Sequence, residues 1–182
     1  MEQRPVLDLA IRICGLDQPP IIMADEDLQA LAETVGHALL QRKLMLATAE
    51  SCTGGWISQA ITSVAGSSEW FDRGFVTYSY QAKREMLGVK EDTLARFGAV
   101  SQATVAEMAQ GALASGADVA LAVTGIAGPG GGMAGKPVGT VCFGWAVKGG
   151  KRITDTQLLS GDRTAIRRQA VILSLRGVLR LF

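Results

Sequence analysis

The sequence predicts an α/β fold, a three-layer α/β/α sandwich built on a mixed, mostly parallel sheet of about five strands. The first observation is that short apolar runs of strand type alternate with helical periods as far as residue 124. Such alternation is typical of parallel βαβ units with right-handed crossovers. The second is that strand-type segments over 138–147 and 153–159 are separated only by Lys148-Gly149-Gly150-Lys151. This spacing predicts a closing antiparallel hairpin.

The composition indicates one globular domain. The chain has 182 residues, of which 48% are hydrophobic and 19% charged, and its net charge is +1. A chain of this length can bury a core that needs no disulfides. Near neutrality offers no broad basic surface for nucleic acid or anionic membranes. We therefore expect an N-terminal extension over 1–24, a single domain over 25–182, and no nucleic-acid or membrane partner.

The remaining bulk features point to the cytoplasm. The three cysteines, Cys14, Cys52 and Cys142, form no C-x-x-C pair, which disfavours a disulfide framework or a zinc site. Charged residues interrupt every apolar run near the N-terminus, so no signal peptide is expected. No apolar run approaches the roughly 18 residues of a membrane span. We expect a cytoplasmic protein that holds neither metal nor cofactor.

The first half of the domain has six expected elements. Apolar residues recur every three to four positions in its helices and form continuous or aromatic-rich runs in its strands. The elements are a helix over 25–42 begun by Asp25, a strand over 44–49, a helix over 54–62, a strand over 74–79, a helix over 81–87 ended by Gly88, and a short helix over 91–97. His37, the single histidine, is interpreted as a surface residue of the first helix, which disfavours Ser-His-Asp and Cys-His catalysis.

The second half completes the sheet. Ser101 and Asp162 are suited to begin helices, and Gly116 is suited to end one. The expected elements are a long helix from Ser101 to Gly116, a strand over 118–124, a glycine-rich loop, strands over 138–147 and 153–159, and a helix from Asp162 to 182. The last helix has apolar residues to spare, which favours a homodimer or a larger homo-oligomer; they are Ile166, Ala170, Val171, Leu175, Val178 and Leu181.

Three turns are expected to converge on one site, because ligands of such sheets bind at the carboxyl ends of the strands. The turns span residues 50–55, 78–83 and 124–132. In the first turn, the chain passes from a strand to a helix, and Ser51 or Cys52 is the candidate nucleophile. Free amides at the start of the helix could stabilise an oxyanion there. A thiol needs only a small fall in its pKa there, whereas a serine needs a base. A plain capped turn is the alternative.

Lys83 is the candidate base in the second turn. A lysine has a pKa of about 10.4 in water, so desolvation would have to lower it for Lys83 to act near neutral pH. The alternative is a solvated helix lysine.

In the third turn, the glycines offer amides for a phosphate or ribose, or else form a mobile surface loop. The P-loop and dinucleotide patterns fail there because a strand follows instead of a helix.

Arg163 stands at the start of the last helix, where a phosphate could bind. For Arg167 and Arg168 we favour a solvated helix face.

Several uncommon motifs together resemble the CinA C-terminal domain family, from about residue 27 to 178. They are AESCTGGWIS, AGSSEWFDRGFVTYSYQAKREMLGV, GAVS, TGIAGPGGG, KPVGTVCFGWA and SGDRTAIRRQA. Stand-alone members of this family are nicotinamide-nucleotide amidases. The resemblance therefore implies hydrolysis of nicotinamide mononucleotide (NMN) to nicotinic acid mononucleotide and ammonia, by a serine/lysine pair without metal. Tyr80 and Gly130 stand where many relatives carry Asn and an acidic residue.

The resemblance also implies roles for individual residues. Ser51 becomes the nucleophile, Lys83 the base, Thr124 and Tyr78 supporting polar groups, and Arg163 a phosphate contact. The other substrate-binding residues expected are Glu50, Cys52, Thr53, Gly54, Gly55, Gly125, Gly128, Gly130 and Gly131. A catalytically silent nucleotide- or partner-binding module of the CinA group is the alternative function, and hydrolysis through Cys52 is an alternative mechanism.

Overall fold

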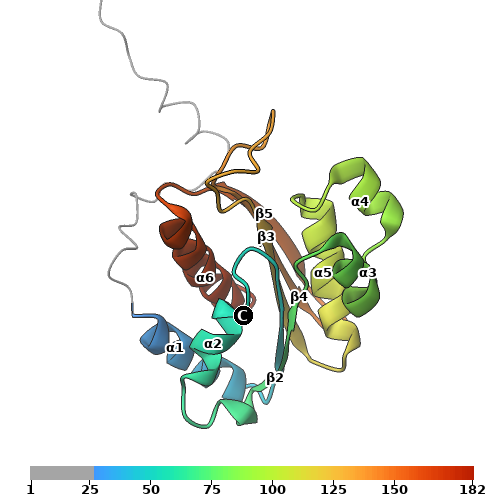
Figure 1. The fold of residues 1–182 in the computed structure, drawn as a ribbon. Helices are drawn as coiled ribbons and strands as arrows, with labels where there is room; N and C mark the ends of the chain where they lie inside the picture. The colour runs from blue at the N-terminus through green and yellow to red at the C-terminus, as the bar shows by residue number, and fades with distance from the viewer. Residues whose placement is uncertain (1–26) are drawn as a thin grey trace, which may run out of the picture.

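A five-stranded sheet organises the computed structural model, which describes residues 27–182 (Figure 1). The expected extension over 1–24 lies outside these residues. The elements in chain order are α1 (Leu28–Leu40), β1 (Leu46–Glu50), α2 (Trp56–Thr62), the 3-10 helix η4 (Ser67–Glu69), β2 (Phe71–Val76), α3 (Tyr80–Leu87), α4 (Glu91–Phe97), α5 (Gln102–Ala114), β3 (Val119–Gly125), β4 (Thr140–Val147), β5 (Arg152–Leu158) and α6 (Arg163–Leu179).

The topology of the sheet is mixed, as the sequence predicts. The strand order is β2-β1-β3-β4-β5. Strand β1 pairs in parallel with both β2 and β3, and β4 pairs antiparallel with both β3 and β5. The carboxyl ends of the first three strands therefore meet at one edge of the sheet.

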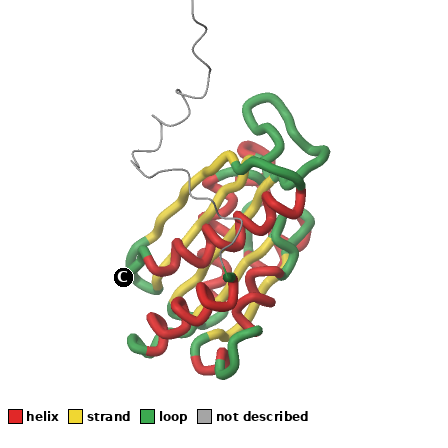
Figure 2. The backbone as a smooth tube through the Cα atoms, turned by 90° about the vertical axis from the view of Figure 1, so that its left-hand side faces the viewer, coloured by secondary structure: helices red, strands yellow, loops and turns green. Residues whose placement is uncertain are grey.

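Two helical layers cover the sheet. Helices α1, α2 and α6 lie on one face and α3, α4 and α5 on the other (Figure 1), and Figure 2 shows the first layer in front of the strands. Alternate residues of β4 serve the two layers: Phe143 and Trp145 join the core under α6, while Cys142 and Ala146 join the core under α5. Within residues 27–182, no helix is long and apolar enough to cross a membrane.

Some boundaries differ from those expected. Asp27 begins α1 by accepting a hydrogen bond from the Gln29 amide, and the expected cap, Asp25, lies outside the described residues. Strand β2 begins at Phe71 rather than residue 74, since an edge strand tolerates the charged residues that follow Phe71. The strand ends at Val76 because the chain then turns away from the sheet to begin α3. Ser79 caps this helix, and its hydroxyl accepts a 3.0 Å hydrogen bond from the Ala82 amide.

The final helix has no spare apolar face. Its apolar residues named above as a basis for self-association are buried against the sheet and the neighbouring helices, apart from the partly buried Leu181. That argument for a homodimer is therefore wrong, because one chain already uses these side chains. The single histidine, His37, is exposed on α1, as expected.

Candidate active site

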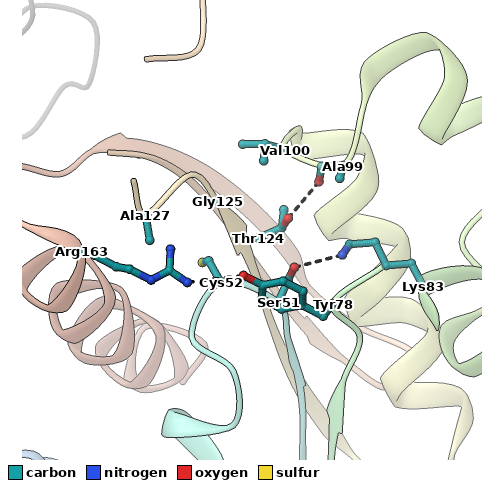
Figure 3. Close-up of a pocket in the computed structure, with 10 residues that line it drawn as sticks. All are labelled: Ser51, Cys52, Tyr78, Lys83, Ala99, Val100, Thr124, Gly125, Ala127 and Arg163. Atoms are coloured by element: carbon teal, nitrogen blue, oxygen red, sulfur yellow. Dashed lines mark hydrogen bonds between the residues drawn. The ribbon is translucent and has the colours of Figure 1, made fainter. Parts of the chain in front are cut away.

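A cavity of about 220 Å³ lies where the first three strands end (Figure 3). All three expected turns contribute to it, so the predicted convergence is confirmed. The residues that line it are Ser51, Cys52, Tyr78, Lys83, Ala99, Val100, Thr124, Gly125, Ala127 and Arg163.

The central contact of the cavity joins a lysine to a serine. Ser51 follows β1 directly, and its amide donates a 3.1 Å hydrogen bond to the carbonyl of Val123, which anchors it to β3. Lys83 comes from α3, and its Nζ lies 3.0 Å from Ser51 Oγ and 2.7 Å from the Thr77 carbonyl oxygen. The Thr77 carbonyl thus orients the amine toward the serine hydroxyl.

The environment of Lys83 favours a neutral amine. Its side chain is 1% exposed, and none of the salt bridges found among residues 27–182 includes it. Burial without a counter-ion lowers the pKa of Lys83 from 10.5 to about 8. About one amine in ten is then neutral at pH 7, against fewer than about one in a thousand for a lysine in water. A neutral amine can accept the proton of the Ser51 hydroxyl.

Cys52 has the opposite character. Its thiol is 6% exposed, and burial raises its pKa to about 12, with the Glu50 carboxylate adding to the rise. The fall in pKa that we expected at the start of a helix is therefore wrong, because desolvation is the largest influence on this thiol. A protonated thiol is a poor nucleophile. The geometry favours Ser51 over Cys52.

Glu50 holds the turn that presents Ser51. Its side chain is fully buried, and one carboxylate oxygen accepts hydrogen bonds from Thr53 Oγ1 and the amides of Gly55 and Ile57, at 2.7–3.0 Å. The other oxygen accepts from the amide and hydroxyl of Ser58, at 2.8 and 2.7 Å. These donors include the amides at the start of α2. The expectation that they are free to stabilise an oxyanion is wrong.

Arg167 holds the same turn from α6. Its Nε donates to the Cys52 carbonyl at 3.1 Å and its Nη2 to the Thr53 carbonyl at 2.7 Å, while its guanidinium lies over the Trp56 ring. The solvated face expected for Arg167 is therefore wrong. Its partners lie more than a hundred residues earlier in the chain, where no local pattern in the sequence could reveal them. The turn also needs glycine at residue 54, where φ is +62°.

Arg163 and Lys83 approach the cavity from opposite sides (Figure 3). Arg163 Nη1 donates to the Gly128 carbonyl at 2.7 Å, and its Nη2 lies 3.4 Å from Tyr78 Oη. The guanidinium is exposed at the cavity and keeps further N–H groups for an anion. Within residues 27–182, no group of three or more His, Cys, Asp or Glu residues is arranged to hold a metal ion.

Comparison with known proteins identifies the family. The model of the CinA C-terminal domain matches residues 28–182. The chain belongs to the CinA C-terminal domain family.

Curated relatives and solved structures agree with this assignment. A protein of Escherichia coli strain K12 named nicotinamide-nucleotide amidohydrolase PncC is 54% identical over 161 residues, which cover 88% of this chain and 98% of the relative. A protein of the same name from Enterobacter agglomerans is 56% identical with the same coverage. The crystal structure of a competence/damage inducible protein from Agrobacterium tumefaciens has a TM-score of 0.83 and 45% identity, covering 91% of this chain and 99% of that one.

The cavity of this CinA domain includes only some of the expected site residues. Those that line it are Ser51, Cys52, Tyr78, Lys83, Thr124, Gly125 and Arg163. Those that do not line it are Glu50, Thr53, Gly54, Gly55, Gly128, Gly130 and Gly131. Glu50 and Thr53 are buried and hydrogen-bonded to each other within the protein, so their contribution is to hold the turn. Gly130 and Gly131 lie in an exposed part of the loop.

Three residues of the cavity wall were not expected from the sequence, namely Ala99, Val100 and Ala127. Their side chains are small and apolar, so no chemistry distinguishes them in a sequence. The only signal was their place in the GAVS and TGIAGPGGG motifs.

We predict that Glu50→Gln destabilises the CinA domain by about 2–4 kcal/mol. The amide nitrogen of glutamine would face N–H and O–H donors, leaving at least one buried donor without an acceptor. The free energy of unfolding, measured by urea denaturation, tests this. Glu69→Gln is the matched control, because Glu69 is exposed and its change should stay within about 0.5 kcal/mol. Equal stability of both variants would contradict the role given to Glu50.

Proposed function

We propose that this CinA domain hydrolyses the carboxamide of NMN, giving nicotinic acid mononucleotide and ammonia. The observation that carries the proposal is the 3.0 Å hydrogen bond between the buried Lys83 amine and the Ser51 hydroxyl. A buried lysine with a lowered pKa beside a serine is one arrangement that activates the serine as a nucleophile. The names of the Escherichia coli and Enterobacter agglomerans relatives supply the substrate.

In the first half of the reaction, Ser51 Oγ attacks the carboxamide carbon while neutral Lys83 accepts the hydroxyl proton. The pyridinium ring withdraws electrons from the carboxamide and assists the attack. The tetrahedral intermediate collapses when the carbon–nitrogen bond breaks, and the Lys83 ammonium returns its proton to the departing nitrogen, which leaves as ammonia. The nicotinoyl group stays on Ser51 as an ester.

The second half repeats the chemistry with water. Neutral Lys83 takes a proton from a water molecule, whose oxygen attacks the ester carbon. Ser51 leaves with the proton held by Lys83, and the product is a carboxylic acid that ionises. No step needs a metal ion or cofactor. The Thr77 carbonyl, 2.7 Å from Lys83 Nζ, keeps the amine in place through both halves.

The remaining polar groups suit the rest of the nucleotide. The Arg163 guanidinium is the cationic group that lines the cavity opposite Lys83, and we assign it to the phosphate. Tyr78 is 66% exposed at the cavity and lies against Arg163, where its ring and hydroxyl can contact the sugar or pyridinium ring. Thr124 and Gly125 line the same cavity, and the Thr124 hydroxyl, which donates to the Ala99 carbonyl, can still accept a hydrogen bond from the substrate.

The lysine/serine pair is tested by a double-mutant cycle. We expect Ser51→Ala and Lys83→Met each to lower ammonia release from NMN by about a thousandfold or more, and the double variant to be no worse than either, because the two residues act as a unit. Circular dichroism checks that the fold is retained. Cys52→Ala should keep a substantial fraction of activity.

Two outcomes would contradict this account. Wild-type protein that binds NMN but releases no ammonia, with or without chelator, would indicate the silent binding module. An inactive Cys52→Ala together with an active Lys83→Met would indicate thiol chemistry.

Arg163→Ala tests the phosphate contact. We expect KM for NMN to rise about ten- to a hundredfold with little change in kcat, because a distant phosphate is held equally in the ground state and the transition state. Arg84→Ala is the control, since Arg84 lies on α3 and pairs with Glu91 at the protein surface. A loss confined to kcat would assign Arg163 to the chemical step.

A further inference from the structure

One wall of the cavity is a short backbone segment, Phe97–Val100, which leads from the last residue of α4 toward α5. Ala99 and Val100 line the cavity, and they contribute shape without reactive groups. Gly98 gives the segment its turn, with φ at +76°, a conformation that other residues rarely adopt. Because the wall consists of backbone and small side chains, its position depends on what holds it.

Two side chains from distant parts of the chain hold this wall from outside. Tyr80 Oη accepts a 3.2 Å hydrogen bond from the Ala99 amide. Lys136 Nζ donates a 2.7 Å hydrogen bond to the Phe97 carbonyl. Both polar atoms also approach Gly98, because a Cβ placed there would lie 3.9 Å from Tyr80 Oη and 3.8 Å from Lys136 Nζ. The two ties therefore flank a single turn.

Each tie connects the wall to another part of the site. Tyr80 is the first residue of α3, the helix that carries Lys83. Lys136 belongs to the glycine-rich loop, whose Gly128 carbonyl binds Arg163. On the cavity side, the Thr124 hydroxyl donates a 3.0 Å hydrogen bond to the Ala99 carbonyl (Figure 3). The wall is thus fixed in a frame that includes the base, the phosphate contact and Thr124.

Neither Tyr80 nor Lys136 lines the cavity itself. Tyr80 is 52% exposed, and Lys136 faces a second cavity of about 430 Å³ on the other side of Val100. Within the cavity beside Ser51, a substrate would meet the wall and neither of these side chains. Any effect that they have on the reaction must act through the wall.

We propose that Tyr80 and Lys136 are positioning residues that fix the Phe97–Val100 wall and thereby set the affinity of the site for its nucleotide. The inference rests on the function proposed above. The wall offers the substrate small apolar side chains and no reactive group, so its displacement is expected to weaken the ground state and the transition state alike. The expected signature is a rise in KM with kcat unchanged.

Two variants each remove one tie. Tyr80→Phe keeps the ring and loses the hydroxyl, and Lys136→Met keeps the length and loses the donor. We expect each to raise KM for NMN about two- to tenfold, as the loss of one hydrogen bond would, with kcat unchanged. Lys136→Arg should restore a donor and most of the affinity. Lys148→Met is the matched control, because Lys148 is exposed on the turn between β4 and β5.

Exchange of the Ala99 amide hydrogen, followed by NMR, reports on the wall without any turnover. Tyr80→Phe should speed this exchange, since the amide loses its acceptor. Faster exchange with a raised KM supports the proposal. Faster exchange with an unchanged KM, unchanged exchange, or a loss confined to kcat would overturn it.

A wild-type protein that releases no ammonia would refute the proposed function without removing this test. The dissociation constant of NMN, measured by calorimetry on the same variants, then takes the place of KM. The same two- to tenfold rise is expected, and equal dissociation constants in wild type and both variants would overturn the proposal.

Discussion

The burial of Lys83 without a counter-ion is the constraint on which the site depends. An ammonium group in this position costs stability, and the protein lowers that cost by lowering the pKa of the amine to about 8. The same burial yields a neutral amine at the pH where a base is needed. The sheet makes the contact possible: β1 and β2 are neighbours, so the residue after β1 meets the helix that follows β2. A lysine in solvent at the same distance from Ser51 would remain charged and inert.

The charged residues around Ser51 and Lys83 fall into two kinds: some hold the turn in place, and one faces the cavity. Glu50 and Arg167 bind opposite sides of the turn that carries Ser51, one through amides and hydroxyls and the other through carbonyls. Because Glu50 occupies the amides at the start of α2, those amides serve the stability of the turn. Arg163, by contrast, keeps donors directed at the cavity. A charged residue near the reacting groups can therefore be structural, and its hydrogen bonds decide which role it has.

The alternation of strands and helices was sufficient to predict the layers, the parallel strands and the edge where the site lies. Lys83 and the neighbours Ser51 and Cys52 could be selected because they carry reactive groups and follow strands, and the resemblance to the family then favoured Ser51. The sequence did not reveal that Glu50 faces inward, since a one-residue difference in where β1 ends decides it. Arg167 was misjudged because its partners lie far away in the chain. Ala99 and Val100 were missed because small apolar side chains carry no chemical signal. The apolar residues of α6 wrongly indicated self-association, because periodicity does not distinguish a core within one chain from an interface between two chains.

Titration of the Lys83 amine by ¹⁵N NMR tests the central claim most directly. Lys83→Met identifies the signal by its absence, and Ser51→Ala shows whether burial or the serine sets the pKa. We predict that Lys83 titrates near 8 in wild type and in Ser51→Ala, and that kcat/KM for ammonia release rises with pH through the same value, because the neutral amine is the base. A Lys83 signal that titrates near 10.5, as an ordinary lysine does, would contradict the account.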